Sequence, residues 1–368
     1  MSETFLRPTF AEVDLTKLAA NLTRVRTQVA PSVKLLTLVK ANAYGHGAVP
    51  VSQFLQEKQL CEFLGVASVE EGMQLRQAGV KLPILVLGSI YPFEAFEYAI
   101  KNKLAVTIAS LEAAKAVCKI AEELKQPAFC HVKQDTGMGR IGTRRGKVVE
   151  VLEALANHPY IVLDGLYSHL SSVDTDPAYT EEQIGYYRDT LTNMQLRGIK
   201  VNYRHLAASA ALVERPDIHY DMVRPGHSAY GLEQGYQPIL SLKTRIVYVK
   251  DVPAGASISY GRSFIADKPL KVATLPIGYG DGYLRALSNK AEVLIKGKRC
   301  RVLGNITMDM MMVDITGVAP VQVGEEVVVV GKQGSEEITL AELAQKAGTI
   351  DYELCTLLSA RVPRVYKR

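Results

Sequence analysis

The sequence has few of the features that are typical of exported proteins, membrane proteins or proteins stabilised by a structural metal. Its five cysteines are scattered over 368 residues, with no Cys-x-x-Cys pair and no histidine at metal-ligand spacing beside them. This usage suits a reducing compartment and argues against structural zinc. The N-terminal residues show no charged region followed by an apolar one, and no apolar run approaches the length of a membrane span. We therefore expect a soluble, cytoplasmic protein that binds neither a metal nor a membrane.

A strong charge of one sign is also lacking. Lysine and arginine total 43 against 38 aspartates and glutamates, which gives a formal net charge of +5. The two signs are interspersed and no basic block stands out, so we expect no nucleic-acid partner. Hydrophobic residues, in contrast, make up 48% of the chain, which is enough for sizeable cores. At this length we expect two domains, or one large barrel with an appended unit.

Short apolar runs alternate with helical segments through the first two thirds of the chain. The runs lie near residues 34–39, 63–67, 83–87, 104–108, 128–133, 162–167, 201–206 and 220–223. Helical or mixed segments separate them, among them 50–58, 69–78, 93–101, 110–124, 146–156 and 179–197. Eight strands that alternate with helices predict an α/β fold, a parallel (β/α)8, TIM-like barrel over residues 10–238.

The pattern changes near Pro238, where helical spacing gives way to short strands separated by turns. The expected strands are 239–249, 257–260, 272–276, 291–295, 300–303, 310–315 and 326–330. One late helix at 338–347 is expected, with Thr339 as its N-cap, just as Asp14 is expected to cap a first helix that ends before Pro31. We therefore predict a mostly β C-terminal domain over residues 239–368, completed by residues 1–9.

Polar side chains follow the apolar runs of the predicted barrel. These residues are Lys40, Ser68, Ser89, Ser110, Asp135, His169, Ser209 and Arg224. Because the carboxyl ends of barrel strands line one mouth, we expect the side chains to converge there.

Lys40 ends the apolar run of residues 34–39. Partial desolvation at a strand end favours the neutral amine, which is the form that makes an imine with a carbonyl compound. Gly45 and Gly47 let the backbone approach a bulky ligand, while Tyr44 and His46 offer donors. Taken alone, Lys40 would more often be an ordinary surface lysine.

Two further groups point to a ligand at the same mouth. Residues 131–142 run from a strand into a glycine-rich turn, which brings Lys133, Asp135 and Arg140 near the rim, although a turn with solvated charges is the plain alternative. Ser209 and the Arg-Pro-Gly-His-Ser run at 224–228 follow strands seven and eight, where barrels commonly bind phosphate. Ser209 alone would more often cap a helix.

A fourth group lies in the predicted β domain. It comprises Ser-Tyr-Gly at 259–261, Gly-Tyr-Gly-Asp-Gly-Tyr at 278–283, Thr-Met-Asp at 307–309 and Tyr-Glu at 352–353. Tyrosines flanked by glycines are usually core or turn residues. Beside a carbonyl cofactor that carries a phosphate, such a tyrosine becomes a candidate second acid–base group.

These blocks, in this order and in both domains, resemble the alanine racemase family of pyridoxal-phosphate enzymes with a barrel and a β domain. The resemblance runs nearly end to end, and it also includes Tyr-Ser-His at 167–169 and Arg-Val-Pro-Arg at 361–364. It implies that Lys40 carries the cofactor imine and that Tyr260 is the opposing base. It further implies that the phosphate is held by Tyr44, Ser209, Tyr352 and the amides of Gly226 and His227.

The resemblance implies further roles around the cofactor. Arg224 would face the pyridine nitrogen with His169 behind it, and Arg140 with the Met308 amide would bind the substrate carboxylate. Tyr279 and Tyr352 would narrow the entrance, and the lysine that matches Lys133 is carbamylated in many members. Members are head-to-tail homodimers with shared active sites, and they supply D-alanine as a peptidoglycan precursor. The small-molecule substrate implied is alanine.

The residue chemistry agrees with a racemase. Inverting a stereocentre by proton transfer needs a proton to leave one face and arrive on the other, so Lys40 and Tyr260 on opposite sides suit the task. Arginine is effectively always protonated, so Arg224 can only donate to a ring nitrogen. The sequence departs from the family where Ala208, Thr307 and His227 replace a frequent Asn, a Cys and a small aliphatic residue.

Three alternatives remain beside an alanine racemase. A racemase for another amino acid, such as serine or a basic residue, would share the machinery. A decarboxylase of the same barrel type would need different residues in place of Tyr260 and the 278–282 turn. A pyridoxal-phosphate-binding protein without turnover would resemble a bare barrel, and the predicted β domain speaks against it.

Overall fold

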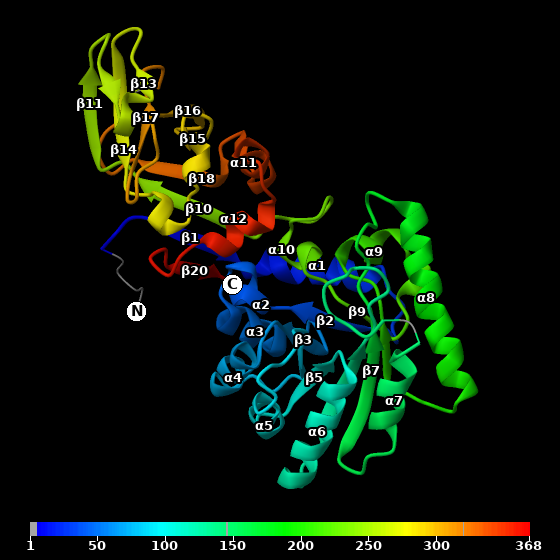
Figure 1. The fold of residues 1–368 in the computed structure, drawn as a ribbon. Coiled ribbons are helices and arrows are strands. Elements are labelled where there is room, and N and C mark those ends of the chain that lie inside the picture. Colours follow the sequence, from blue (N-terminus) through cyan, green and yellow to red (C-terminus); the bar gives the residue numbers. More distant parts are fainter. Residues whose placement is uncertain (1–5, 145, 319) are drawn as a thin grey trace.

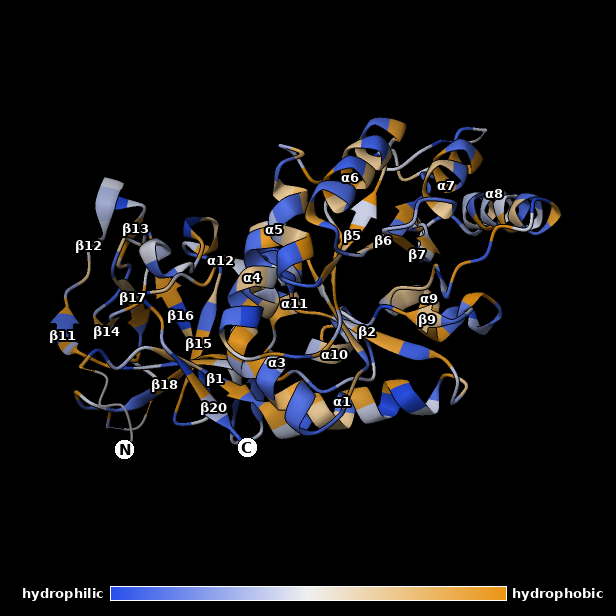
Figure 2. Cartoon of the chain, turned by 90° about the horizontal axis from the view of Figure 1, so that it is seen from below, coloured by the Kyte–Doolittle hydropathy of each residue, from blue (hydrophilic) through white to orange (hydrophobic). Residues whose placement is uncertain are grey.

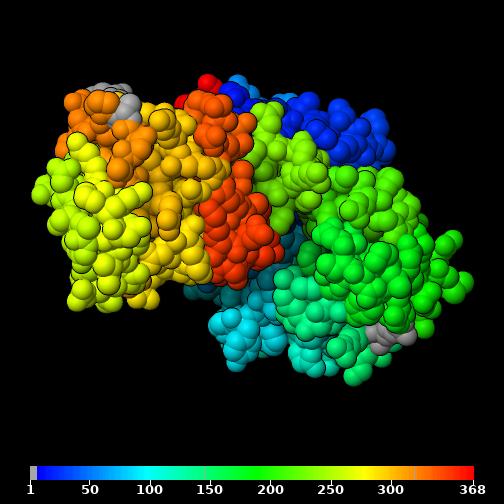
Figure 3. Space-filling view, turned by 90° about the horizontal axis from the view of Figure 1, so that it is seen from above, coloured from blue at the N-terminus to red at the C-terminus, as the bar shows by residue number. Residues whose placement is uncertain are grey.

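The computed structural model describes residues 6–144, 146–318 and 320–368 and divides into two parts (Figure 1). A barrel of strands and surrounding helices forms one part, and a sheet-rich second part lies beside it. The segment of α12 (Asp351–Leu357) lies where the two parts meet, and Figure 3 shows the surface hollowed between it and the green barrel segment. Within the described ranges, no helix combines the length and the hydrophobicity needed to cross a bilayer.

Eight parallel strands form the barrel, which confirms the predicted TIM-like architecture. They are β2 (Lys34–Leu38), β3 (Phe63–Val66), β4 (Ile84–Val86), β5 (Leu104–Ile108), β6 (Ala128–Lys133), β7 (Ile161–Tyr167), β8 (Tyr203–His205) and β9 (Met222–Val223). Their order in the sheet is β8-β7-β6-β5-β4-β3-β2-β9. The ring closes between β8 and β9, where the backbone N–H of Asp221 donates to the Arg204 carbonyl at 3.0 Å.

Helices surround the strands and bury one face against them. They are α1 (Leu15–Thr27), α3 (Ala48–Glu57), α4 (Val69–Gln77), α5 (Ala95–Lys101), α6 (Leu111–Leu124), α7 (Val148–Ala156) and α8 (Pro177–Leu196), with the shorter α2 (Lys40–Tyr44), α9 (Ser209–Glu214), η1 (Pro216–Ile218) and α10 (His227–Tyr230). Figure 2 shows hydrophilic and hydrophobic residues side by side on α1 and α6. In α1 the buried positions recur at the three- and four-residue spacing of an amphipathic helix. Asp14 caps this helix as expected, accepting from Thr16 N and Lys17 N at 3.0 and 3.1 Å.

An apolar layer lies inside the barrel, and two of its members, Phe63 and Ala105, line the cavity near the N-terminal ends of the strands. Its buried members are Leu36, Phe63, Leu85, Ala105 and Met222, one from each of five strands. The layer separates the mouth at the C-terminal strand ends, where Lys40 and Arg224 lie, from the opposite mouth. The two ends of the barrel can therefore carry different chemistry.

The second part is built on a ten-stranded sheet. Its strands are β1 (Phe10–Asp14), β10 (Leu240–Arg245), β11 (Tyr248–Val252), β14 (Leu270–Leu275), β15 (Glu292–Ile295), β16 (Lys298–Leu303), β17 (Met311–Asp314), β18 (Glu326–Gln333), β19 (Glu336–Ile338) and β20 (Arg364–Lys367). A small hairpin of β12 (Ser257–Ile258) and β13 (Phe264–Ile265) and the short helices η2 (Tyr260–Arg262), η3 (Tyr279–Asp281) and η4 (Arg285–Leu287) complete it, with α11 (Leu340–Ala347) and α12. Thr339 caps α11 as expected, accepting from Glu342 N at 3.0 Å.

Several details of this part differ from the sequence expectation. β1, which the expected boundary at residue 10 assigned to the barrel, pairs with β10 and β20 in the second sheet. The single strand expected over 239–249 is broken into β10 and β11, which pair with β18 and β14 respectively. Helix α12 and the strands β13, β19 and β20 were not expected. The strand pairings depend on partners that are distant in sequence, and the periodicity of a single segment does not reveal them.

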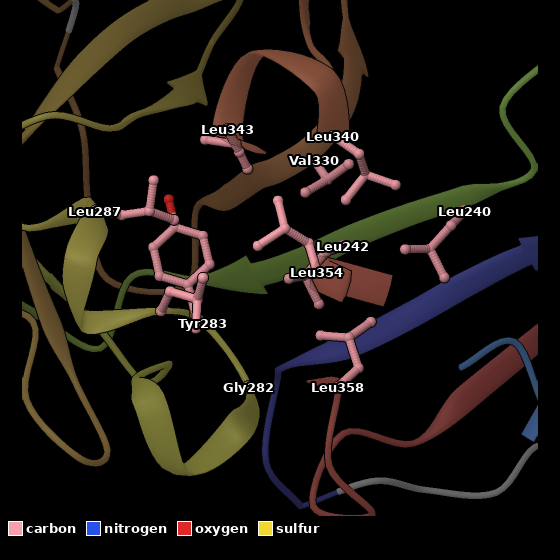
Figure 4. Close-up of a pocket in the computed structure, with 11 residues that line it drawn as sticks. Leu240, Leu242, Gly282, Tyr283, Leu287, Val330, Leu340, Leu343, Leu354 and Leu358 are labelled. Carbon is pink, nitrogen blue, oxygen red and sulfur yellow. The ribbon is translucent and has the colours of Figure 1, made fainter. Parts of the chain in front are cut away.

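A small cavity lies in the core of the second part, surrounded mainly by leucines (Figure 4). Its walls come from β10, β18, α11 and α12, together with Tyr283, whose buried hydroxyl finds no partner among the described residues. The free volume of about 20 Å³ holds a single water at most. We read this cavity as a packing defect of an apolar core rather than as a ligand site.

Candidate active site

Lys40 lies at the C-terminal end of β2 and opens a left-handed turn. Ala41, Asn42, Ala43 and Tyr44 all have φ between 50° and 56°, although none is glycine. Such a conformation costs roughly 1–2 kcal/mol per residue. The turn is held by hydrogen bonds from outside it. The Ala48 N–H donates to Asn42 Oδ1 at 2.8 Å, and the Ala41 N–H donates to Glu71 at 2.7 Å.

The loop after this turn packs tightly on the second domain. A Cβ on Gly45 would lie 1.9 Å from the Cys355 carbonyl oxygen of α12, so only glycine fits there. Arg364 Nε donates to the Gly45 carbonyl at 3.0 Å, and the Tyr366 hydroxyl donates to that of His46 at 3.0 Å. His46 itself is fully buried and stacks on Tyr230, so it does not offer a donor at the mouth as the sequence suggested.

Lys40 shares the mouth with several other cations. Burial, followed by the charges of Arg140 and Arg224, lowers the pKa of Lys40, while Glu71 partly opposes this shift. Both oxygens of Glu71 are occupied by the backbone N–H groups of Ala41 and Ala67. Within the described residues the Lys40 amine makes no hydrogen bond or ion pair, so it is free to react as the neutral nucleophile.

Lys133, at the end of β6, has the same cationic neighbours as Lys40. It is 4% exposed, and burial together with the charges of Arg140, Arg224 and Lys40 lowers its pKa to about 7. Its Nζ lies 5.3 Å from the ring centre of Tyr167, and the Arg224 Cζ lies 5.5 Å from the same centre. Tyr167 therefore forms a common support for both cations.

Arg224 is 3% exposed, and hydrogen bonds from its guanidinium group to the barrel interior hold its side chain in place. Nη2 donates to the carbonyls of Ser168 and Leu206 at 2.8 and 2.9 Å, and Nη1 lies 3.0 Å from His205 Nδ1. His169 Nδ1 lies 3.4 Å from Nη2, as the expected neighbour behind the arginine. Among the described residues Nε has no acceptor, which leaves a fixed N–H to donate to a ligand.

Ser209 and the turn at residues 226–228 are buried next to Tyr44 and together supply hydroxyl and backbone N–H donors, which we call the Ser209 cradle. Ser209 Oγ accepts from Gly226 N at 3.0 Å and from Ser228 N at 3.3 Å. A Cβ on Gly226 would lie 2.9 Å from the Tyr44 hydroxyl, so the glycine keeps this hydroxyl close to the turn. Hydroxyls and backbone amides at the end of the last barrel strands are suited to a phosphate.

The second domain reaches this cradle through α12. The Tyr352 ring lies 4.3 Å, centroid to centroid, from the ring of His227, and the Tyr44 ring lies 6.4 Å from the same imidazole. Burial, followed by the nearby Tyr352, raises the pKa of Tyr44 to about 12, so its hydroxyl remains a donor. The structure thus brings together Lys40, Tyr44, Lys133, His169, Ser209, Arg224, Gly226, His227 and Tyr352.

The glycine-rich turn after β6 is folded around Asp135. Its Oδ1 accepts from the backbone N–H groups of Gly137 and Gly139, both at 3.0 Å. Asp135 therefore shapes the loop instead of facing the ligand. Arg140 follows on the same loop with an exposed side chain, close enough to influence the pKa of Lys40 and Lys133.

Tyr260, Tyr279 and Met308 form a separate group on the second domain. Their side chains are 74%, 43% and 53% exposed. The Tyr279 N–H donates to the Thr307 carbonyl at 3.0 Å, and Asn305 Nδ2 donates to the Tyr260 carbonyl at 2.7 Å, which ties the loops together. Figure 1 shows β13, the strand just after η2, at the far end of the second domain from α2. Within one chain, Tyr260 and Lys40 are not brought together.

Two of the remaining strand-end serines cap helices, and the third, Ser89, is exposed. Ser68 and Ser110 cap α4 and α6, accepting from Glu71 N at 3.4 Å and from Ala113 N at 3.1 Å. The sequence reasoning also missed the buried polar residues below Arg224, namely Asp164, His131 and His205. A signal was present in His131, which lies two residues before Lys133 on one strand and therefore on the same inward face.

The residues at the mouth fit pyridoxal phosphate. Lys40 offers an amine for its carbonyl carbon, Arg224 Nε a donor for its ring nitrogen, and the Ser209 cradle with Tyr44 and Tyr352 donors for its phosphate. A barrel mouth lined by several cations attracts an anionic ligand. Within the described ranges, no group of three or more histidine, cysteine or acidic residues is placed to hold a metal ion.

Comparison with known proteins identifies relatives of both domains. The family described as alanine racemase, N-terminal domain, matches residues 13–234, and that described as alanine racemase, C-terminal domain, matches residues 239–366. An alanine racemase of Symbiobacterium thermophilum is 44% identical over 371 residues, 98% of this chain and 97% of that protein. One of Halothermothrix orenii is 40% identical over 376 residues, 100% of this chain and 99% of that protein. The structure of alanine racemase from Clostridium difficile 630 matches with a TM-score of 0.94 at 38% identity, covering 99% of this chain and 97% of that one.

Proposed function

Since the chain belongs to the alanine racemase family, we propose that Lys40 and Tyr260 are the two acid–base groups with which it interconverts L-alanine and D-alanine. The observation that carries this proposal is the gathering of Lys40, Lys133 and Arg224 at one mouth, with the neutral amine of Lys40 favoured by burial and by its cationic neighbours. Such a mouth suits a carbonyl cofactor with a phosphate and a substrate with a carboxylate.

The cofactor of this proposal is pyridoxal 5'-phosphate. When bound, it supplies an electron sink that acidifies the α-hydrogen of an attached amino acid. Tyr44, Ser209, Tyr352 and the amides of Gly226 and His227 hold its phosphate, and Arg224 donates to its ring nitrogen with His169 behind. Because the pKa of Arg224 is about 10 even after burial, the guanidinium keeps its proton and the ring nitrogen gains none.

The chain's own residues then divide the proton transfers. Lys40 removes or returns the α-proton on one face, and Tyr260 acts on the opposite face. Arg140 and the Met308 amide bind the substrate carboxylate, and Tyr279 with Tyr352 narrows the entrance. The pKa of about 7 leaves much of Lys133 neutral near pH 7. A neutral amine forms an N–C bond to CO₂ and releases one N–H proton to solvent, which gives a carbamate anion that pairs with Arg140.

The active site on this proposal is shared between two subunits. Tyr260, Tyr279 and Met308 are exposed on the second domain, and β13, which follows Tyr260 closely in sequence, lies far from α2 in Figure 1. A head-to-tail homodimer with two-fold symmetry brings the second domain of each chain over the barrel of the other and completes two sites. The surfaces that meet are then the hollow between α12 and the barrel (Figure 3) and the loops around η2 and η3.

The test is exchange of the α-proton for deuterium, followed by NMR in heavy water with the cofactor present. A panel of L- and D-amino acids should show exchange of both alanine enantiomers with formation of the opposite one. Serine should exchange more slowly. The absence of exchange with alanine, or release of CO₂ from any substrate, would refute the proposal and favour the decarboxylase alternative. The same samples in gel filtration with light scattering report whether the chain is a dimer.

A further inference from the structure

A chain of hydrogen bonds runs from Arg224 down through the interior of the barrel. Arg224 Nη1 lies 3.0 Å from His205 Nδ1, and His205 Nε2 lies 3.0 Å from His131 Nδ1. His131 Nε2 lies 3.3 Å from Asp164 Oδ2, whose other oxygen accepts from Asn202 Nδ2 at 2.8 Å. The two imidazoles are fully buried and Asp164 is 8% exposed. The chain therefore connects β9, β8, β6 and β7 inside the barrel.

The protons in this chain have a single consistent arrangement. Arginine only donates, so His205 Nδ1 must accept, and the one proton of a neutral imidazole is then on Nε2. That N–H donates to His131 Nδ1, which places the proton of His131 on its own Nε2, pointing at the Asp164 carboxylate. A doubly protonated His131 would turn an N–H against the N–H of His205. The chain is thus directed from Arg224 to Asp164.

Neighbouring residues hold the two imidazoles in place. The His205 ring stacks on Tyr167 at 4.7 Å with an interplanar angle of 9°, and the His131 ring lies parallel to Tyr203 at 6.5 Å. Gly165, next to Asp164 on β7, leaves room for His131, because a Cβ there would lie 2.1 Å from its Nδ1. The chain is therefore a built feature of the fold and not a chance contact of mobile side chains.

Asp164 lies at the opposite end of the barrel from Lys40. It borders a cavity of about 730 Å³ whose walls include Phe63, Phe129 and Tyr203, at the N-terminal ends of the strands. The carboxylate can therefore stay partly solvated, and the hydrogen bond from His131 keeps its pKa below the usual range although burial raises it. The hydrogen-bond chain therefore starts at a cation that donates, Arg224, and ends at an anion that accepts, Asp164.

We propose that Asp164 is a positioning residue for Arg224: acting through His131 and His205, its carboxylate fixes the proton arrangement that holds the guanidinium as a donor toward the cofactor ring. This inference rests on the proposed function of Arg224. It predicts an effect on the reaction from a residue at the opposite end of the barrel, which touches neither substrate nor cofactor.

The first test uses the unmodified holoenzyme with ¹⁵N-labelled histidine. Nitrogen chemical shifts distinguish the two tautomers and the cation, so both His131 and His205 should appear as neutral Nε2–H forms. His205 should remain neutral down to about pH 5.5, because burial and the charge of Arg224 lower its pKa well below the ordinary histidine value. An Nδ1–H tautomer or a cation at either residue would overturn the directed chain, whether or not the enzyme racemises alanine.

The second test replaces the acceptor at the end of the chain. In Asp164→Leu an apolar side chain of similar size replaces the carboxylate, so the His131 proton loses its protein acceptor. We expect mixed tautomers at His131 and His205, an altered cofactor absorbance and a kcat lowered roughly ten- to hundredfold, as for outer partners of ligating histidines. KM for alanine should change less, because the substrate contacts remain.

Two further variants separate positioning from stability. Asp164→Asn still accepts through its amide oxygen, so it should keep the tautomers and restore most of the rate. Asp221→Leu removes another carboxylate near this end, which pairs with Arg204 at 2.7 Å and touches neither histidine, and it should lower Tm without moving tautomers or kcat. Unchanged tautomers and rate in Asp164→Leu, or an Asn variant no better than Leu, would overturn the proposal. An inactive unmodified enzyme with the predicted tautomers would instead refute the proposed function.

Discussion

The ring of Tyr352, on helix α12 of the second domain, lies 4.3 Å from the imidazole of His227 in the last helical turn of the barrel. This contact makes the barrel mouth a product of both domains within one chain. The Tyr44 ring lies 6.4 Å from the same imidazole, and burial, followed by the charge of Tyr352, raises the pKa of Tyr44 to about 12. Cofactor retention should therefore depend on the second domain even though Lys40 belongs to the barrel.

Tyr352→Phe tests this dependence. It removes one hydroxyl and keeps the ring contact, so a hydrogen bond to a charged phosphate, worth about 1.5–3 kcal/mol, is lost. We expect cofactor affinity to fall tenfold or more while Tm of the apoenzyme is unchanged, as measured by fluorescence titration with pyridoxal phosphate. Tyr98→Phe, on the exposed face of α5, is the matched control and should bind normally. Equal affinities for the two variants would remove Tyr352 from the phosphate site.

Lys40→Ala should abolish the visible absorbance of bound cofactor and the racemisation of alanine together. Reduction of the unmodified enzyme with borohydride and peptide mass analysis should place the cofactor on the peptide that contains Lys40. Lys133 is the other buried lysine at the mouth, with a pKa of about 7. Labelling of the Lys133 peptide, or a visible band retained in the alanine variant, would assign the anchor to Lys133.

Lys133 also predicts a pH dependence of stability. Its folded pKa of about 7 lies below the usual lysine value of about 10.5, so between these values the unfolded chain binds more protons. The contribution of Lys133 is fully present above about pH 10.5 and is lost as pH falls toward 7. Stability should therefore rise with pH across this window by at most about 1.4 kcal/mol per pH unit.

Lys133→Met keeps the length of the side chain and removes the titrating amine. In CO₂-free buffer, the unfolding free energy of the variant should be flatter than that of the unmodified protein between about pH 7 and pH 9. Denaturant titrations at several pH values measure both slopes. Identical slopes would mean that Lys133 titrates in the folded protein as it does in the unfolded chain.

Much of the fold follows from local patterns in the sequence. The apolar runs that end at Lys40 and Arg224 are strands of the barrel, and Asp14 and Thr339 cap helices because their side chains reach free backbone N–H groups. Lys40 could be singled out because an apolar run stops on a charged residue followed by glycines. These features depend on neighbours in the sequence, so one chain suffices to predict them.

Features that depend on distant partners could not be predicted. No glycine marks Ala41 as left-handed, because the conformation is imposed by contacts with Glu71 and with α12. The pairing of β1 with β10 and β20 is a meeting of segments more than two hundred residues apart. The hydrogen bonds from Asp164 to Arg224 join residues in or next to four strands. Nothing in the sequence around His131 or His205 indicates which residue it contacts.

The left-handed turn predicts a gain in stability from a small change. Ala41 is exposed and has φ 50°, so Ala41→Gly relieves roughly 1–2 kcal/mol of backbone strain and gives back about 0.4–1 kcal/mol through the freer unfolded chain. The unfolding free energy should rise by up to about 1 kcal/mol. Ala154→Gly, at an exposed position of α7, should lower it by about 0.5–1 kcal/mol. Two variants with the same sign of effect would contradict the strain argument.

The last prediction concerns the shared active site. Lys40 belongs to the barrel mouth, and Tyr260 is 74% exposed on the second domain, just before β13, which lies far from α2 in Figure 1. In a head-to-tail dimer, a Lys40→Ala chain paired with a Tyr260→Phe chain has one site with both defects and one site with none. Each homodimer should be nearly inactive, while the purified hybrid should recover about half of the unmodified activity.

The hybrid is obtained by co-expression with two different tags and purification of the species that carries both. A random mixture should recover about a quarter of the activity, because about half of its dimers are hybrids. The matched control pairs Lys40→Ala with Arg224→Ala, two residues of one mouth, so that each site of the hybrid keeps one defect and stays inactive. If the Lys40 and Tyr260 hybrid is as inactive as this control, both bases come from one chain and the shared-site proposal is wrong.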